Sequence, residues 1–154
     1  MKQVKKLNTR KSGPKASRQF GLELPAEVEA LPVLAAFAQT VAREAGFPER
    51  SRNHIQLALE EITMNILRHG SGQGSFVKIR ATLGDGDLRL EVLDTGRPFG
   101  FEQAMELYNG IASPDQEIGG IGLYLVKNLM DEVHYQPGTP EGNRMTLIKN
   151  KEGM

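Results

Sequence analysis

Apolar residues recur at helical spacing along the middle of the chain. Four of them fall on one face of a helix: Ile55, Leu59, Ile62 and Ile66. Glu61, Asn65 and His69 recur every four residues and form a polar stripe beside that face. A solvated helix surface would also carry polar residues, and this is the plain alternative. A carboxylate and a carboxamide one turn apart at the edge of a core instead favour a helix that lines a binding site.

The residues before this helix predict a strand and another helix. A short edge strand is expected over residues 19–24, because Pro25 stops it. Pro25 also begins a helix-start pattern, and apolar residues at helical spacing continue up to Gly46 and Pro48. These two residues end the helix, since glycine tolerates a left-handed turn and proline cannot continue it. The central helix is then expected over residues 49–69.

Two runs of alternating apolar and polar residues follow, at 76–83 and 88–93, and the Gly84-Asp85-Gly86-Asp87 segment between them predicts a hairpin. Residues of the second run divide between two faces: Leu88, Leu90 and Val92 on one, Arg89 and Glu91 on the other. This alternation predicts an antiparallel sheet that is covered on one side.

Shorter elements are predicted in the rest of the chain. They are a short helix at 101–108, an irregular stretch at 109–118, a helix that opens at Gly119, and strands at 133–136 and 144–149. The irregular stretch is either a mobile cover over a pocket or a surface loop.

Composition limits the class of protein. The 154 residues predict one domain with a substantial core. The chain has no cysteine, which excludes disulfides, thiolate metal sites and cysteine catalysis. No apolar run approaches the ~20 residues of a membrane span, and residues 1–18 do not resemble a secretion leader. We therefore expect a cytoplasmic protein without a membrane contact.

Charge is distributed unevenly although the net charge is zero. Residues 1–18 carry seven Lys or Arg and no acid, which leaves 12 basic and 19 acidic side chains for the rest. This basic tail is either a contact for nucleic acid or a partner or a disordered segment outside the fold. The acidic remainder disfavours direct nucleic-acid binding by the domain itself. The predicted organisation is a disordered tail at 1–18, a domain at 19–150 and a short tail at 151–154.

Asp94 lies where the second strand of the hairpin ends, directly before Thr95 and Gly96. Aspartate beside glycine is common in turns, which is the structural alternative. An ionised carboxylate is also an acceptor that can hold an amino group such as the exocyclic amine of adenine. Gly96 would let a flat ring lie against the backbone.

Glycines open the helix predicted near residue 119. Gly119, Gly120 and Gly122 would leave backbone N–H groups unobstructed where the helix dipole favours anions, so a phosphate could bind there. The pattern is neither the G-x-x-x-x-G-K-[ST] phosphate loop nor G-x-G-x-x-G after a strand. A simple helix cap is the alternative.

Other polar residues have structural alternatives. Thr146 on the last strand is either a packing residue or a hydroxyl that reaches a ligand. His54 and His134 fall in packed or strand segments, and structural roles are expected for both.

Three short patterns together resemble a known family. Glu61-x-x-x-Asn65, Asp94-x-Gly96-x-Pro98-Phe99 and Gly120-x-Gly122 have the order and approximate spacing of the GHKL, or Bergerat-fold, ATP-binding proteins. The chain more closely resembles the bacterial anti-sigma factor serine kinases, and the resemblance covers roughly residues 19–150. It implies an α+β fold, a two-layer α/β sandwich whose mixed, mostly antiparallel sheet is covered on one face by about three helices.

The resemblance also implies roles for individual residues. Glu61 would deprotonate the hydroxyl that attacks the γ-phosphate, and Asn65 would give an oxygen to Mg²⁺. Asp94 and Gly96 would hold adenine. The phosphates would lie at the glycine-rich turn, whose members are Gly120, Ile121, Gly122 and Leu123. His69 and Thr146 match family positions near the nucleotide.

The function implied by the resemblance is an ATP- and Mg²⁺-dependent serine/threonine kinase. It would phosphorylate an anti-anti-sigma (STAS) protein and hold a sigma factor inactive, and two copies of the chain could pair. Two alternatives stay open. One is a binding module whose ATP or ADP state controls its partner without phosphotransfer. The other is the catalytic part of a split histidine kinase, although the chain has no spare helical hairpin with a phospho-accepting histidine.

Overall fold

The computed structural model describes residues 17–70, 75–98, 100 and 118–151. The expected basic tail lies almost wholly outside these residues. The helix expected at 101–108 and the irregular stretch after it also lie outside them, apart from Ile118.

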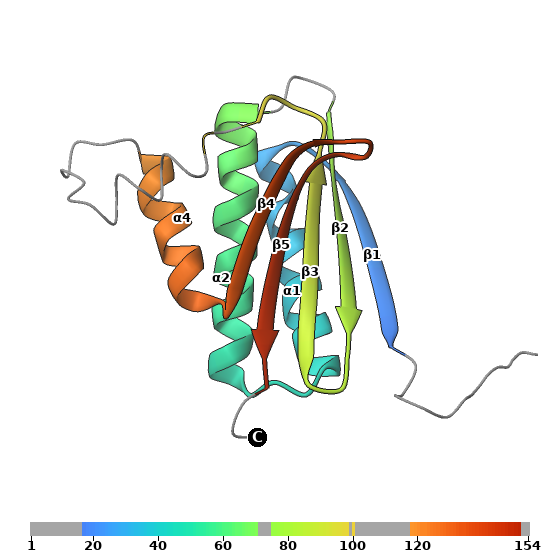
Figure 1. The fold of residues 1–154 in the computed structure, drawn as a ribbon. Helices are drawn as coiled ribbons and strands as arrows, with labels where there is room; N and C mark the ends of the chain where they lie inside the picture. Colours follow the sequence, from blue (N-terminus) through green and yellow to red (C-terminus); the bar gives the residue numbers. More distant parts are fainter. Residues whose placement is uncertain (1–16, 71–74, 99, 101–117, 152–154) are drawn as a thin grey trace, which may run out of the picture.

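The described chain forms a two-layer α+β structure. In chain order its elements are β1 (Arg18–Pro25), the 3₁₀ turn η1 (Val28–Ala30), α1 (Leu31–Glu44), α2 (Glu49–Asn65), the π-helical turn η2 (Ile66–Gly70), β2 (Phe76–Leu83), β3 (Asp87–Asp94), α4 (Ile118–Leu129), β4 (Glu132–Thr139) and β5 (Gly142–Asn150). The strands form one sheet in the order β1-β2-β3-β5-β4. The three α-helices lie together on one face of it (Figure 1). This arrangement confirms the predicted fold class.

All four strand pairings in the described sheet are antiparallel. The predicted hairpin is β2 and β3, which pair from Val77 with Asp94 to Leu83 with Leu88. β1 is an edge strand, as its proline-terminated sequence predicted. β5 is inserted between β3 and β4, so strands distant in sequence become neighbours at the centre of the sheet.

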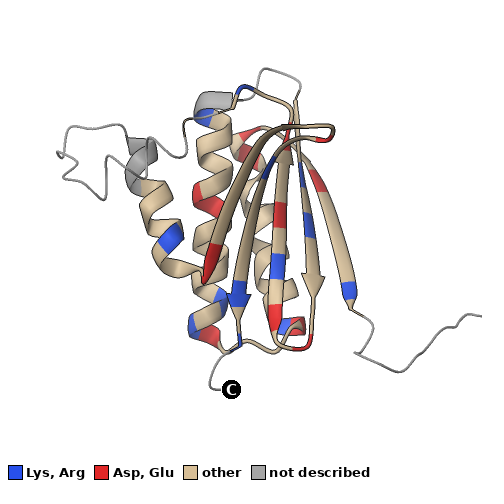
Figure 2. Cartoon of the chain, in the orientation of Figure 1, with Lys and Arg blue, Asp and Glu red and all other residues tan. Residues whose placement is uncertain are grey.

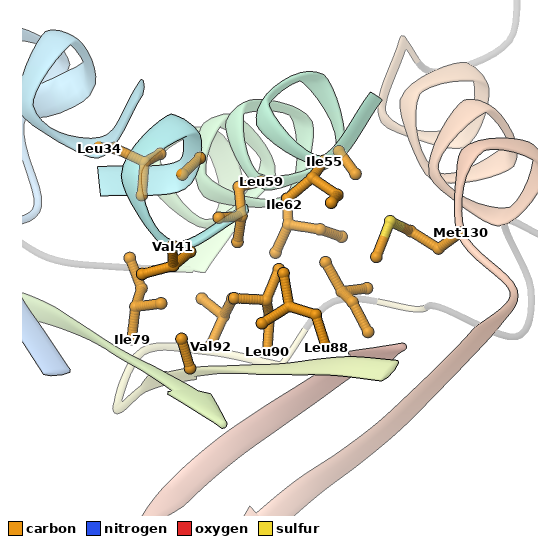
Figure 3. Packing of buried hydrophobic residues seen from close by; sticks show 14 of the residues in the cluster. Leu34, Val41, Ile55, Leu59, Ile62, Ile79, Leu88, Leu90, Val92 and Met130 are labelled. Atoms are coloured by element: carbon orange, nitrogen blue, oxygen red, sulfur yellow. The ribbon is translucent and has the colours of Figure 1, made fainter. Parts of the chain in front are cut away.

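The core lies between α2 and the sheet. Ile55, Leu59 and Ile62, three members of the predicted apolar face of α2, are fully buried. They face Leu90 and Val92 of β3 across the layer (Figure 3). The same alternation places Arg89 and Glu91 on the opposite face, because successive strand residues point to opposite sides.

Two helices differ from their predicted boundaries. The helix predicted from Pro25 begins as an α-helix only at Leu31, after the 3₁₀ turn, with Pro32 in its first turn. Proline suits that place because its missing N–H is not needed there. α2 ends at Asn65 and continues as the π-helical turn through Gly70. The four-residue repeat that aligned His69 with Asn65 therefore does not hold there, since π-helical bonds span five residues.

The other face of the sheet carries ion pairs and is covered by no described helix (Figure 1). Arg80 on β2 pairs with Glu91 at 3.1 Å and with Glu141 at 3.3 Å. Arg144 contacts the same Glu141 at 3.4 Å. Acidic and basic residues follow one another along β3 (Figure 2). Among the described helices, none has both the length and the apolar character needed to cross a membrane.

Candidate functional site

Asn65 and Glu61 are held together at the C-terminal end of α2. The Asn65 side chain is 2% exposed, and its Nδ2 donates to the main-chain carbonyl of Glu61 at 2.9 Å. This bond fixes the amide, because it assigns Nδ2 to the helix and turns Oδ1 away from that carbonyl. Asn65 can therefore offer an oxygen to a cation, and Glu61, half-buried one turn earlier, can offer a carboxylate.

Gly122 of α4 brings the second helix against this pair. A Cβ atom placed on Gly122 would lie 2.6 Å from Oε1 of Glu61 and 3.5 Å from Nδ2 of Asn65. A carbon and an oxygen cannot approach so closely without movement, so the carboxylate occupies the space that any larger residue would need. Glu61 and Asn65 were predicted from one pattern and Gly122 from another. The structure brings these three residues together, on two helices that pack against each other.

Asp94 ends β3 as a buried carboxylate, 5% exposed. Its Oδ2 accepts the main-chain N–H of Gly96 at 2.9 Å and lies 3.5 Å from Nδ2 of Asn143. Both of these donors are on Oδ2, and no other described residue donates to Oδ1. Burial raises the pKa of Asp94, and the hydrogen bonds from Gly96 and Asn143 oppose that rise.

The Glu61–Asn65–Gly122 group and the carboxylate of Asp94 lie at the same end of the described structure. β3 and α2 both end there, and α4 begins there (Figure 1). Asp94 is on the helix side of the sheet, since it alternates in step with the core residues Leu90 and Val92. In the first turn of α4, the N–H groups have no acceptor within the helix. Carboxylates, an amide oxygen and the main-chain N–H groups of the first turn of α4 therefore lie at the same end of the described chain, on the helix side of the sheet.

Other predicted residues are placed differently. Thr146 is buried on the ion-paired face of the sheet, because it alternates with the core residues Met145 and Leu147. It lines a hollow of about 510 Å³ together with Glu91 and His134. The structure thus does not bring Thr146 together with Asp94, whose side chain points to the other face.

Four remaining predicted residues belong to helical segments. Leu123 is 2% exposed and packs in the hydrophobic core, so a ligand could meet only its backbone. Gly120 and Ile121 lie in the first turns of α4, as predicted, and His69 lies in the π-helical turn. For His69, Gly120 and Ile121, only the backbone is described.

Asn143 is the polar residue that the sequence reasoning missed. It is 4% exposed and is the cross-strand partner of Asp94 in the β3–β5 pairing. Strand alternation could have indicated it, since Asn143 is in step with the apolar residues Met145 and Leu147 whereas Thr146 is not. The pairing with Asp94 could not be read from the sequence, because 49 residues separate them.

Comparison with known proteins places this geometry in a family. Residues 24–149 match the family model described as a histidine kinase-like ATPase domain. This range includes α2, the end of β3 and the start of α4.

Several relatives resemble the chain over most of its length. It is 29% identical to the serine-protein kinase RsbW of Bacillus pumilus over 139 residues, covering 85% of this chain and 86% of the relative. The RsbW of Bacillus subtilis is 28% identical over 137 residues, with the same coverage. The anti-sigma F factor of Clostridium acetobutylicum is 31% identical over 98 residues, which cover 62% of this chain and 67% of the relative. With its helices on one side of an antiparallel sheet and its polar residues gathered at one end, the chain belongs to the histidine kinase-like (GHKL-type) ATPase family.

Proposed function

We propose that this protein binds ATP with Mg²⁺ and transfers the γ-phosphoryl group to a serine or threonine of a protein partner. One observation carries the proposal. The Glu61 carboxylate lies against the glycine backbone of α4, one turn from the amide of Asn65. A domain that only bound nucleotide would have no need of a carboxylate beside the expected phosphate position. The names of the relatives, which include serine-protein kinases, support the same activity.

Each residue has a defined part in this reaction. Oδ1 of Asp94 would accept the adenine amine, while the N–H groups at the start of α4 would hold phosphate oxygens. The Asn65 amide oxygen would be the protein ligand of Mg²⁺, which takes most of its other ligands from phosphate and water. Bound there, the ion would neutralise charge on the β- and γ-phosphates.

Glu61 would act as general base. It would take the proton of the partner's hydroxyl as that oxygen forms its bond to the γ-phosphorus. The bond from phosphorus to the oxygen bridging the β-phosphate breaks in the same transfer, and ADP leaves. The half-buried position of Glu61 supports this role, since its side chain is only partly covered and can still be reached from outside.

We further propose that the partner is an anti-anti-sigma protein of the STAS type and that the kinase holds a sigma factor when it is not phosphorylating that partner. This finer proposal comes from the relatives, one of which is named an anti-sigma F factor. Capture of proteins from source cells with and without ATP would test it. Recovery of neither a sigma factor nor a STAS protein would count against it.

Replacement of Glu61 tests the kinase proposal. We expect Glu61→Gln to bind ATP within about threefold of the wild type, as measured by calorimetry with Mg²⁺. Transfer of labelled phosphate to STAS proteins purified from the same source should fall by roughly 10²- to 10⁴-fold, the usual contribution of a general base.

Glu60→Gln is the matched control. Glu60 is the next residue of α2 and accepts a hydrogen bond from Gln56 at 3.3 Å, away from Gly122. Its replacement should leave transfer unchanged. Equal loss in both variants, or full transfer by Glu61→Gln, would contradict the role of Glu61. If the wild type binds ATP and its partner but transfers nothing, the binding-module alternative is the better account.

A further inference from the structure

We propose that a hollow on the uncovered face of the sheet binds the carboxylate of a small organic acid. The hollow has a volume of about 510 Å³ and lies on the side that no described helix covers (Figure 1). Polar residues from β3, β4 and β5 line it: Arg89, Glu91, His134, Gln136, Arg144 and Thr146. Asp94 and Glu61 are on the helix side of the sheet, so binding in this hollow does not depend on the proposed function.

Thr146 leaves room for a ligand because it is a short residue among longer ones. Its cross-strand partners are Glu91 on β3 and His134 on β4. Arg89 is diagonal to it, at a separation that a long side chain can span. Thr146 is almost fully buried although no described helix covers this face, so the neighbouring side chains enclose it.

The hydroxyl of Thr146 can bond to such a ligand. No hydrogen bond to this hydroxyl is found within the part of the chain that the structure describes. Buried polar groups in folded proteins nearly always have a partner, and an oxygen of a bound ligand would be one. The sequence analysis expected a ligand for this hydroxyl beside the nucleotide, whereas the structure places Thr146 in the hollow on the other face.

The charges around the hollow favour a ligand with one negative charge. Glu91 is already balanced, since its Oε1 is 3.1 Å from Nε of Arg80 and its Oε2 is 3.9 Å from Nε of Arg144. Among the described residues, none forms an ion pair with Arg89. Arg89 therefore leaves one positive charge uncompensated, and its planar guanidinium matches the two oxygens of a carboxylate.

Two other occupants match the hollow less well. A phosphate dianion would bring a second negative charge toward the carboxylate of Glu91, which is still partly exposed. A protein partner is disfavoured because the centres of protein interfaces are depleted in charged residues such as Glu91. The volume of about 510 Å³ is instead within the range of small-molecule pockets.

Benzoate is a suitable probe, and benzamide, which has nearly the same shape without the charge, is its control. We expect benzoate to bind in the millimolar range, as a ligand of few atoms should. It should shift the amide NMR signals of β3, β4 and β5 around Thr146. Benzamide should bind at least about tenfold more weakly, because it lacks a charged acceptor. Absence of benzoate binding, or equal binding of benzamide or inorganic phosphate, would overturn the proposal.

Replacement of Arg89 tests which cation holds the carboxylate. Arg89→Gln should lower benzoate affinity at least about tenfold, since a hydrogen bond between charged groups is lost. Arg43→Gln is the matched control, because it removes the same charge from an exposed position of α1. It should change benzoate affinity by less than about twofold. Equal losses in the two variants would show general electrostatic attraction and no defined site.

Thr146→Val removes the hydroxyl and keeps the shape of the side chain. We expect benzoate affinity to fall at least about threefold, as for one lost hydrogen bond, and ATP affinity to stay unchanged. Weaker ATP binding with unchanged benzoate binding would overturn the role of Thr146 in this hollow. Urea unfolding identifies any loss that comes from unfolding, and if Thr146→Val does not fold, Arg89→Gln decides alone. Absence of ATP binding by the wild type would overturn the proposed function and not this site.

Discussion

At the scale of single residues, the candidate site contains a carboxyl group, that of Asp94, whose ionised form is disfavoured by burial. Asp94 is 5% exposed, and burial raises its pKa although two donors partly stabilise its charge. A folded state with a raised carboxyl pKa binds its proton more tightly than the unfolded chain does. Its contribution to stability is therefore full below the unfolded pKa and is lost as pH rises through the folded pKa. At pH values above its raised pKa, Asp94 carries a charge that costs the fold stability, as charged groups in binding sites often do.

Replacement of Asp94 by asparagine should separate stability from binding. We expect ligand-free Asp94→Asn to be more stable than the wild type at pH 7, with the difference shrinking as pH falls through the raised pKa. Urea unfolding at several pH values measures this. ATP affinity should fall roughly 10- to 100-fold, because a hydrogen bond to a charged group contributes about 1.5–3 kcal/mol.

Asp85→Asn is the control for this prediction, since Asp85 is exposed in the β2–β3 turn. Asp85→Asn should change neither the stability of the ligand-free protein nor its affinity for ATP. A lower stability of Asp94→Asn at pH 7 would show that burial is not the dominant influence on this carboxyl.

Residue spacing predicted part of the site and could not predict the rest. Glu61 and Asn65 were found because a helix places every fourth residue in one stripe. Thr146 was named from the sequence and Asn143 was not. Strand alternation places Asn143 on the same face of the sheet as Asp94 and Thr146 on the opposite face. Asn143 could not be chosen from local spacing, because its closeness to Asp94 depends on the register between β3 and β5.

At the scale of elements, α4 packs closely against α2 because Gly122 has no side chain at their contact. The Glu61 carboxylate fills the space beside Gly122. The sequence predicted both helices, and it suggested phosphate binding for the glycines. It did not show that one glycine also gives room to the carboxylate of another helix, because helix packing is not visible in local spacing.

Gly122→Ala should therefore affect catalysis more than folding. The added methyl would force the Glu61 carboxylate to move, and we expect phosphate transfer to fall at least tenfold. Stability should stay the same or rise by up to about 1 kcal/mol, since alanine favours a helix over glycine. Transfer assays and urea unfolding measure the two effects.

Gly86→Ala provides the control, because a Cβ there would meet nothing within 4 Å. Unchanged transfer by Gly122→Ala would mean that the position of the Glu61 carboxylate in the ligand-free protein is not the one used in the reaction.

At the scale of the whole molecule, one apolar layer supports the site. The helices that the structure describes all cover one face of the sheet, and the alternation along β3 predicted which face that would be. The strand order could not be predicted with it, since β5 pairs with β3 across a long stretch of intervening chain. Local patterns specify which residues are buried, and only the folded chain specifies which strands meet.

Leu90→Ala tests how far stability depends on this layer. Leu90 is fully buried at the centre of the core (Figure 3), and the cavity should cost about 2–5 kcal/mol of unfolding free energy. Urea unfolding should show a lower midpoint. Val33→Ala is the matched control, because Val33 is 50% exposed on α1 and should change stability by less than about 0.5 kcal/mol. Similar losses in both variants would contradict a core centred on β3.

The place of β5 between β3 and β4 has a consequence for biosynthesis. Every other described element leaves the ribosome before β5 does. Until then β3 has an unpaired edge, and such edges readily join those of other chains. The nascent protein should therefore be most vulnerable to aggregation just before β5 emerges, and holding by a chaperone would matter most at that moment.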